Sequence, residues 1–255
     1  MRINHNITAL NTHRNMTLNN TAAGKSMEKL SSGLRINRAA DDAAGLAVSE
    51  KMRGQIRGLE QAQRNVQDGI SYVQTAEGAM NEVSSMLTRM KELNVQKANG
   101  TYSSGDKDNI DQELDQLGEQ IDSIIDDTKF NGINITSGAT IQSDDASQQI
   151  TISSVATSGI KGLDSTTSLT GIETAIKNTS TERAKLGAKQ NRLEYTSNNL
   201  GTTVENLTAS ESRIRDTDMA SEMVNLTKNN ILLQASQAML AQANSQPQGV
   251  LSLLR

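Results

Sequence analysis

Apolar residues recur along two long stretches of the chain at alternating spacings of four and three residues. One stretch begins at Met52 and the other at Ile172, and in each of them eight of thirteen positions at this spacing are apolar. A repeat sustained so far beyond the length of a globular helix is typical of a coiled coil. We therefore predict two long helices, over about 50–99 and 170–212, that pack antiparallel.

The stretch between these two helices predicts smaller elements. Apolar residues at helical spacing from Ile110 onward, after an acidic start, indicate a third helix over about 104–129. Residues 133–163 then alternate apolar and polar side chains with many β-branched residues, which favours a β-hairpin. The Gly-rich and charged stretch 31–54 is interpreted as an irregular connector.

Both chain ends show a helical pattern that one partner helix cannot cover. At the start of the chain the pattern consists of Ile3, Ile7 and Leu10. Near the other end, one seam consists of Met219, Met223, Leu226, Leu233 and Leu240. A second seam beside it consists of Ala220, Val224, Ile231, Ala235 and Ala238. Because a second seam needs a second partner, we expect the ends to be loose in the monomer and to become ordered on assembly.

The C-terminal tip adds a further apolar group. It consists of Val250, Leu251, Leu253 and Leu254, and no charged residue occurs from Asn229 to Leu254. The amide side chains within this tract would be costly in hydrocarbon, and no apolar run is long enough to span a membrane. The tip is therefore expected to be covered by protein.

Together these patterns predict a mainly α fold. We expect an elongated antiparallel helical coiled-coil rod with a small β-hairpin, plus a terminal two-helix coil formed by both chain ends. An inner coiled-coil domain would comprise 1–45 and 213–255, including the connector, and a rod domain would comprise 46–212.

Composition agrees with helix-on-helix packing and narrows the function. The chain has one Phe, three Tyr, no Trp and one Pro. Its net charge of −4 gives no general attraction to nucleic acid. It has no cysteine, which excludes disulfides and thiolate metal sites. The N-terminus lacks the apolar region of a signal peptide, which by itself favours a cytosolic protein.

The sequence offers no convincing catalytic or metal-binding motif. Asp41 and Asp42 are a candidate carboxylate pair, but with Arg35 and Arg38 nearby a salt network in the connector is the better interpretation. We predict no cofactor, no metal and no enzymatic activity.

Long stretches at both ends resemble bacterial flagellin, the subunit of the flagellar filament. They include MRINHNITALNTHRN, then SMEKLSSGLRINRAADDAAGLAVSEKMRGQIRGL, and finally RIRDTDMASEMVNLTKNNILLQASQAMLAQANSQPQGVLSLLR. The resemblance implies a discontinuous inner domain, a rod domain and a homopolymer. This chain is a short form without the large outer domains of many members. The resemblance also implies an extracellular protein, exported unfolded through the flagellar type III apparatus without a cleaved signal peptide, and so replaces the cytosolic expectation.

The resemblance also implies binding partners. Four residues match the patch of flagellins that Toll-like receptor five recognises, although they could instead serve rod packing: Arg89, Leu93, Gln96 and Glu113. The tip is similar to the segment sensed by receptors of the NAIP type and should meet an export chaperone before secretion. Filament cap and junction proteins are further expected partners. A hook–filament junction protein and an intracellular coiled-coil scaffold remain alternatives.

Overall fold

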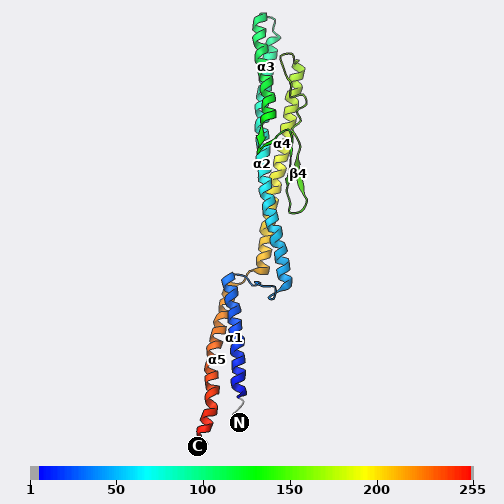
Figure 1. Ribbon diagram of the computed structural model, residues 1–255. Coiled ribbons are helices and arrows are strands. Elements are labelled where there is room, and N and C mark those ends of the chain that lie inside the picture. The colour runs from blue at the N-terminus through cyan, green and yellow to red at the C-terminus, as the bar shows by residue number, and fades with distance from the viewer. Residues whose placement is uncertain (1–5, 254–255) are drawn as a thin grey trace. The chain divides into compact units, whose positions relative to one another are not determined.

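The computed structural model describes residues 6–253 of the 255-residue chain (Figure 1). As predicted, the described chain is mainly helical. It divides into two compact units. One comprises the residues up to Gly54 together with those from Leu207 onward, and the other comprises Gln55–Asn206.

The first unit contains the two terminal helices, α1 (Ile7–Ser32) and α5 (Met219–Leu253). They run antiparallel, because the side-chain amide of Asn6 donates to the carbonyl of Ala243 at 2.7 Å while Thr217 donates its N–H to the carbonyl of Gly33 at 3.0 Å. The predicted terminal two-helix coil is therefore present (Figure 1).

The ends of α1 explain where this helix starts and stops. The Asn6 side chain accepts the N–H of Ala9 and satisfies one of the free donors of the first turn. At the other end Gly33 has a φ of 72°, a left-handed conformation in which glycine is strongly favoured. The chain then enters the connector, where Leu34 forms a β-bridge with Asp216.

The connector is shorter than predicted. Helix α2 (Ala43–Lys97) already begins at Ala43, so the prediction of irregular structure through to residue 54 was wrong. The side chain of Asp42 accepts the N–H of Gly45 at 2.9 Å. It thus acts as a helix N-cap, a signal that is stronger than the helix-breaking tendency of the glycines that follow.

The second unit contains most of α2, helix α3 (Ser104–Asp127) and most of α4 (Leu169–Arg215). An ion pair of 2.8 Å joins Glu77 to Arg183, and another of 3.0 Å joins Lys91 to Glu173. These pairs fix the predicted antiparallel order of α2 and α4.

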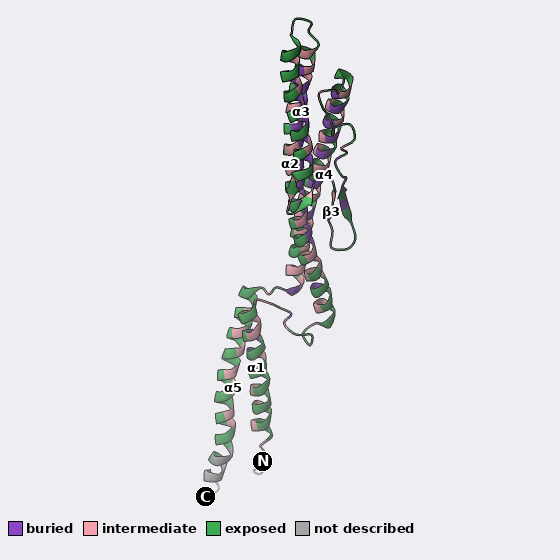
Figure 2. Ribbon diagram, turned by 45° about the horizontal axis from the view of Figure 1, so that its top comes forward, coloured by how far each residue is buried: buried purple, intermediate pink, exposed green. Residues whose placement is uncertain are grey.

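The core of this unit is a continuous stripe on α2. Buried positions recur there at spacings of three and four residues, and Figure 2 shows buried residues along the bundle in which α2, α3 and α4 run side by side. These positions are Leu59, Ala62, Val66, Gly69, Val73, Ala76, Met80, Val83, Leu87 and Met90. Small residues alternate with large ones in the first half of this stripe, which allows neighbouring elements to approach closely.

The strand region contains two short antiparallel pairs where one hairpin over about 133–163 was predicted. In the first pair, β1 (Lys129–Phe130) joins β2 (Ile133–Asn134) through a turn in which both central residues have positive φ. In the second, β3 (Ala139–Gln142) joins β4 (Gln149–Ile152). The side chain of Ile141 lies so close to Gly69 that a Cβ there would meet it at 2.9 Å.

Residues beyond β4 lie against α3 as a strap of turns and bends, residues 160–168. Its backbone is held by α3 carboxylates: Ser165 donates its N–H to Asp115 at 2.8 Å, and Gly162 donates to Asp122 at 3.1 Å. The carbonyl oxygen of Leu163 approaches Gly118 so closely that a Cβ at that position would lie 1.9 Å from it. The strap therefore requires glycine at this point of α3.

Candidate assembly surface

The seam between α1 and α5 is built mainly from small and polar residues. On α1 the inward positions recur at spacings of three and four residues and are Ala9, Thr12, Met16, Asn19, Ala23, Ser26 and Leu30. On α5 they are Glu222, Leu226, Asn229, Leu233, Ser236, Leu240 and Ala243. Of the described α1 residues only Ala23 and Ser26 are fully buried, so the seam removes little apolar surface from water.

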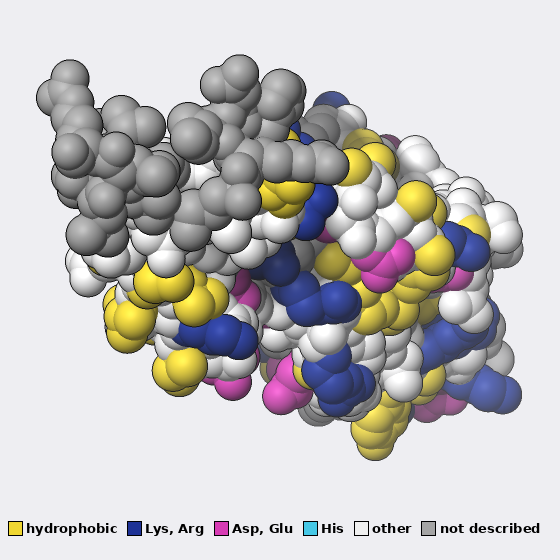
Figure 3. Space-filling view, turned by 90° about the horizontal axis from the view of Figure 1, so that it is seen from below, with side chains coloured by type: hydrophobic (Ala, Val, Ile, Leu, Met, Phe, Trp, Pro, Cys, Tyr) yellow, Lys and Arg dark blue, Asp and Glu magenta, His cyan; other side chains and the backbone are white. Residues whose placement is uncertain are grey.

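Large apolar side chains instead lie on the outside of this coil. Leu10 is 72% exposed, Ile231 is 60% exposed and Met239 is 63% exposed. Others with 39–67% exposure are Ile7, Leu18, Met27, Met219, Met223, Val224 and Leu232. Large apolar side chains left exposed in this number on one coil mark an interaction surface. The view in Figure 3 likewise shows hydrophobic side chains at the surface between charged ones.

The structure splits the first seam that the sequence predicts on α5. Leu226, Leu233 and Leu240 are half-buried toward α1, whereas Met219 and Met223 face solvent. The remaining assembly candidates divide as follows: Ile7, Leu10 and Ile231 are exposed, Ile3 and Leu254 lie outside the described residues, and the side chains of Val250, Leu251 and Leu253 are likewise not described.

The four connector candidates do not pair in the way we predicted, because each finds another partner. Arg38 forms an ion pair with Glu28 at 2.8 Å, and Arg35 donates to the carbonyl of Ile214. Asp41 accepts backbone N–H groups, including that of Arg38 at 2.9 Å, and these hydrogen bonds lower the pKa of its carboxyl. Asp42 caps α2. The connector is therefore held by local capping and backbone contacts rather than by an Arg–Asp network.

The four receptor-patch candidates are only partly brought together at the surface. Arg89 of α2 forms an ion pair of 2.9 Å with Glu113 of α3, and this hydrogen-bonded contact raises the pKa of the guanidinium. Gln96 is exposed and donates to the hydroxyl of Tyr102 at 3.0 Å. Leu93, by contrast, is 2% exposed and belongs to the helical core. Helical spacing could place Leu93 near Arg89 along α2 but could not show that it turns inward.

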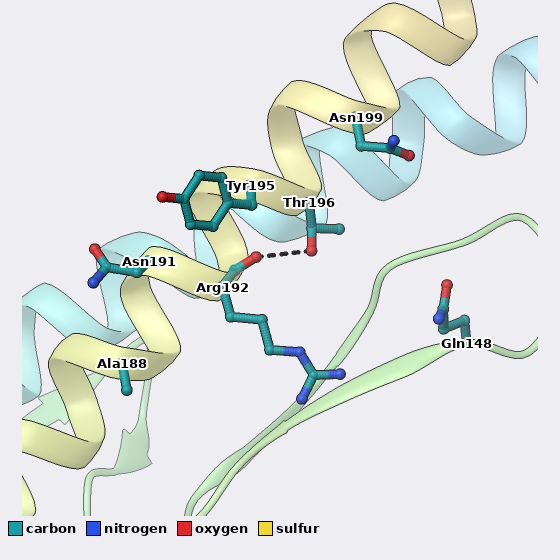
Figure 4. Close-up of a pocket in the computed structure, with 7 residues that line it drawn as sticks. All are labelled: Gln148, Ala188, Asn191, Arg192, Tyr195, Thr196 and Asn199. Carbon is teal, nitrogen blue, oxygen red and sulfur yellow. Dashed lines mark hydrogen bonds between the residues drawn. The ribbon is translucent and has the colours of Figure 1, made fainter.

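The hollows of the second unit carry no recognisable catalytic arrangement. One hollow, of about 470 Å³, lies between α4 and the β3–β4 hairpin (Figure 4). Its lining is Gln148, Ala188, Asn191, Arg192, Tyr195, Thr196 and Asn199. Tyr195 points away from the hairpin while Arg192 extends toward it, so these side chains do not converge on one point.

Neither a metal-binding cluster nor a membrane-spanning helix occurs in residues 6–253. Within this range no cluster of three or more His, Cys, Asp or Glu side chains could hold a metal ion. None of the helices in the same range is long and apolar enough to cross a membrane.

The fold and its exposed apolar coil define a class of protein, a helical subunit built for assembly rather than for chemistry. The model of the bacterial flagellin N-terminal helical region matches residues 3–141, and that of the C-terminal helical region matches residues 169–254. The chain therefore belongs to the bacterial flagellin family. It is a structural, non-enzymatic subunit of the flagellar filament outside the cell.

Individual relatives are similar to this chain in sequence. The chain is 50% identical to a flagellin of Bacillus subtilis and 52% identical to a flagellin of Halalkalibacterium halodurans, and each alignment covers 100% of both chains. It is 45% identical to a flagellar filament 33 kDa core protein of Treponema phagedenis, again over 100% of both chains. A crystal structure of Bacillus cereus flagellin is 34% identical, with a TM-score of 0.49, over 54% of this chain and 88% of that one.

These relatives bear on the two alternatives that the sequence left open. Their names are those of filament proteins, which favours a filament subunit over a hook–filament junction protein and over an unrelated scaffold.

Proposed function

We propose that copies of this chain polymerise through the outward apolar faces of α1 and α5. The observation that supports this proposal is the number of large apolar side chains, among them Leu10 and Ile231, that the terminal coil leaves exposed while its seam consists mainly of small and polar residues. Fully burying a Leu, Ile or Met side chain contributes about 1.5–3 kcal/mol. Several such side chains covered by neighbouring copies would supply the stability that the α1–α5 seam lacks.

The contacts proposed are heterologous. The outward faces of α1 and α5 carry different side chains, so a surface on one copy would be covered by a different surface on the next copy. Repeated contacts of this kind do not close on themselves and generate an open helical assembly. Such an assembly is what a filament requires.

The test compares serine substitutions at exposed apolar positions with serine substitutions at exposed polar positions of the same helices. Leu10→Ser and Ile231→Ser should abolish seeded polymerisation, measured by sedimentation and electron microscopy, because they remove apolar surface that other copies cover. The control variants Asn11→Ser and Gln234→Ser change exposed polar positions on the same helices. Both controls should polymerise like the unmodified chain. Normal polymerisation of the Leu10 and Ile231 variants would contradict the proposal.

For the rod, we propose recognition by Toll-like receptor five at Arg89, Gln96 and Glu113. Support comes from the resemblance together with the exposure of these three side chains and the ion pair between Arg89 and Glu113. The double variant Arg89→Ala/Glu113→Ala should bind the receptor ectodomain at least about tenfold more weakly, since truncating a hot-spot residue, a class in which arginine is enriched, costs about 2 kcal/mol or more. Unchanged affinity would reject this assignment.

The remaining partners follow from the family alone. We propose that the tip containing Val250 to Leu254 is covered by an export chaperone before secretion and can be sensed by NAIP-type receptors. Export would proceed through the flagellar type III apparatus, and cap and junction proteins would meet the ends of the polymer. A pull-down with a chain lacking 241–255 tests the chaperone contact, which should be lost.

A further inference from the structure

Exposed and fully buried methionine side chains lie in different compact units, while Met16, Met52 and Met86 are half-buried. In the first unit, Met27 is 58% exposed, and three methionines of α5 are also exposed: Met219, Met223 and Met239. In the second unit, Met80 and Met90 are 0% exposed and belong to the core of the helical bundle. All of the methionines that the structure describes as exposed therefore lie on the terminal coil.

These exposed thioethers belong to the same surface as the outward aliphatic side chains. Met223 lines a shallow hollow of about 370 Å³ on α5 together with Val224, Thr227, Lys228 and Ile231. Met219 lies one turn before Met223 along the same helix. A change of polarity at these sulfur atoms therefore changes the surface that we assign to assembly.

Peroxides make such a change in one step. The sulfur of methionine attacks one oxygen of hydrogen peroxide, the O–O bond breaks, and methionine sulfoxide and water are formed. The sulfur is oxidised by two electrons and the peroxide is reduced by two. The product is polar and chiral where the thioether was apolar and flexible, which disrupts methionine-rich interfaces, and reductases can reverse it.

We infer that Met27, Met219, Met223 and Met239 form an oxidation-sensitive set, and that their conversion to sulfoxides by peroxide prevents the free subunit from polymerising. This inference rests on the proposed function, because it takes the terminal coil as the assembly surface. Subunits already in a polymer would be protected, since neighbouring copies cover the same side chains. Oxidation would therefore act on unassembled chains.

The first part of the test does not depend on polymerisation. The free chain is treated with hydrogen peroxide, and sulfoxide formation at each methionine is followed by peptide-mapping mass spectrometry. The four exposed methionines should react at least about tenfold faster than Met80 and Met90, because the buried sulfurs react only when the bundle opens. Equal rates at the exposed and buried positions would overturn the inference.

The second part measures assembly. Peroxide treatment should reduce the yield of seeded polymer at least about fivefold, and methionine sulfoxide reductase should restore it. The variant with Leu at all four exposed positions should remain competent after peroxide, whereas the control variant Met80→Leu should stay sensitive. Should the four-Leu variant fail to assemble before treatment, the reductase rescue of the unmodified chain decides instead.

Different results would contradict the proposed function and the present inference. If the untreated chain forms no polymer when seeded, the proposed function fails, while the rates of sulfoxide formation still test the chemistry at the four sites. If treated and untreated chains polymerise equally well despite complete oxidation of these sites, only the present inference is overturned.

Discussion

The terminal coil of α1 and α5 and the bundle of α2, α3 and α4 are both built from antiparallel helices. They differ in where they place their large apolar side chains. In the bundle, the stripe on α2 consists largely of side chains with no exposed surface, such as Val73, Met80 and Leu87. In the coil, small and polar residues make up most of the seam beside a few half-buried leucines, and many large apolar side chains lie outside. The bundle completes its burial within one chain, whereas the coil does not.

This difference shows how one chain can be both stable and ready to assemble. Burial against three neighbouring elements makes the bundle self-sufficient, because α3, α4 and the β3–β4 hairpin each cover part of α2. The coil keeps its apolar side chains for contacts that form only in the presence of other copies. A subunit organised in this way can fold its rod first and complete its ends during assembly.

The largest effect should come from truncating a core side chain of the bundle. Leu114 of α3 has no exposed surface, so Leu114→Ala should lower the free energy of unfolding by about 2–5 kcal/mol. The matched variant in the coil, Leu10→Ala, should change it by less than about 0.5 kcal/mol, because Leu10 lies in water in the free chain. Urea unfolding of the unpolymerised chain followed by circular dichroism measures both. Similar losses in the two variants would remove the distinction between bundle and coil.

A smaller effect should follow from adding a single methyl group. Gly118→Ala should cost about 1–3 kcal/mol, because the new Cβ would meet the carbonyl of Leu163 and push the strap away from α3. Gly78 on α2 and Gly24 on α1 are the controls, since a Cβ at either position meets nothing within 4 Å. Replacing these two by Ala should stabilise the helices by about 0.5–1 kcal/mol. Thermal unfolding of the three variants should therefore show opposite signs; a stable Gly118→Ala variant would contradict the close contact.

The smallest expected effect is a loss of bundle stability at low pH. Hydrogen bonds from Ser103 lower the pKa of Asp106 at the start of α3, and hydrogen bonds from Thr166 and Thr167 lower that of Asp164 in the strap. A carboxyl with a lowered folded-state pKa stabilises the fold above its unfolded pKa of about 3.9, and this contribution disappears as the pH falls through the folded value.

The bundle should therefore lose stability below about pH 4. The double variant Asp106→Asn/Asp164→Asn should show a smaller difference in urea midpoint between pH 7 and pH 3 than the unmodified chain. Glu119→Gln, at an exposed position of α3, is the control and should retain the full difference. An unchanged pH dependence in the double variant would show that these two carboxyls do not hold the ends of the bundle.

The helices were predictable from the sequence because their repeats are long and uninterrupted. The repeat from Met52 onward predicts a stripe through Leu59, Gln63, Val66, Ile70 and Val73, and this prediction was correct only in part. Leu59, Val66 and Val73 are buried as predicted, but the positions between them were placed one residue too late. The structure buries Ala62 and Gly69 rather than Gln63 and Ile70. A spacing pattern based on large apolar residues misses alanine and glycine, although these small residues allow the β3–β4 hairpin to approach α2.

The assembly surface, too, could be predicted from the sequence only in part. The sequence indicates that α5 has more apolar surface than one partner covers, which the exposure of Ile231 and Val224 agrees with. It does not indicate which seam faces α1, because Met219 and Leu226 fit the same spacing and only the position of the neighbouring helix separates them. Likewise, the inward turn of Leu93 depends on where α3 and α4 lie and could not be read from α2 alone.

Amide hydrogen exchange before and after polymerisation is the most direct measurement of whether the ends of the chain complete their burial among other copies. We expect α2, α3 and α4 to be protected in the free chain and α1 and α5 to gain strong protection only in the polymer. Full protection of α1 and α5 in the free chain, with no increase on polymerisation, would contradict this expectation.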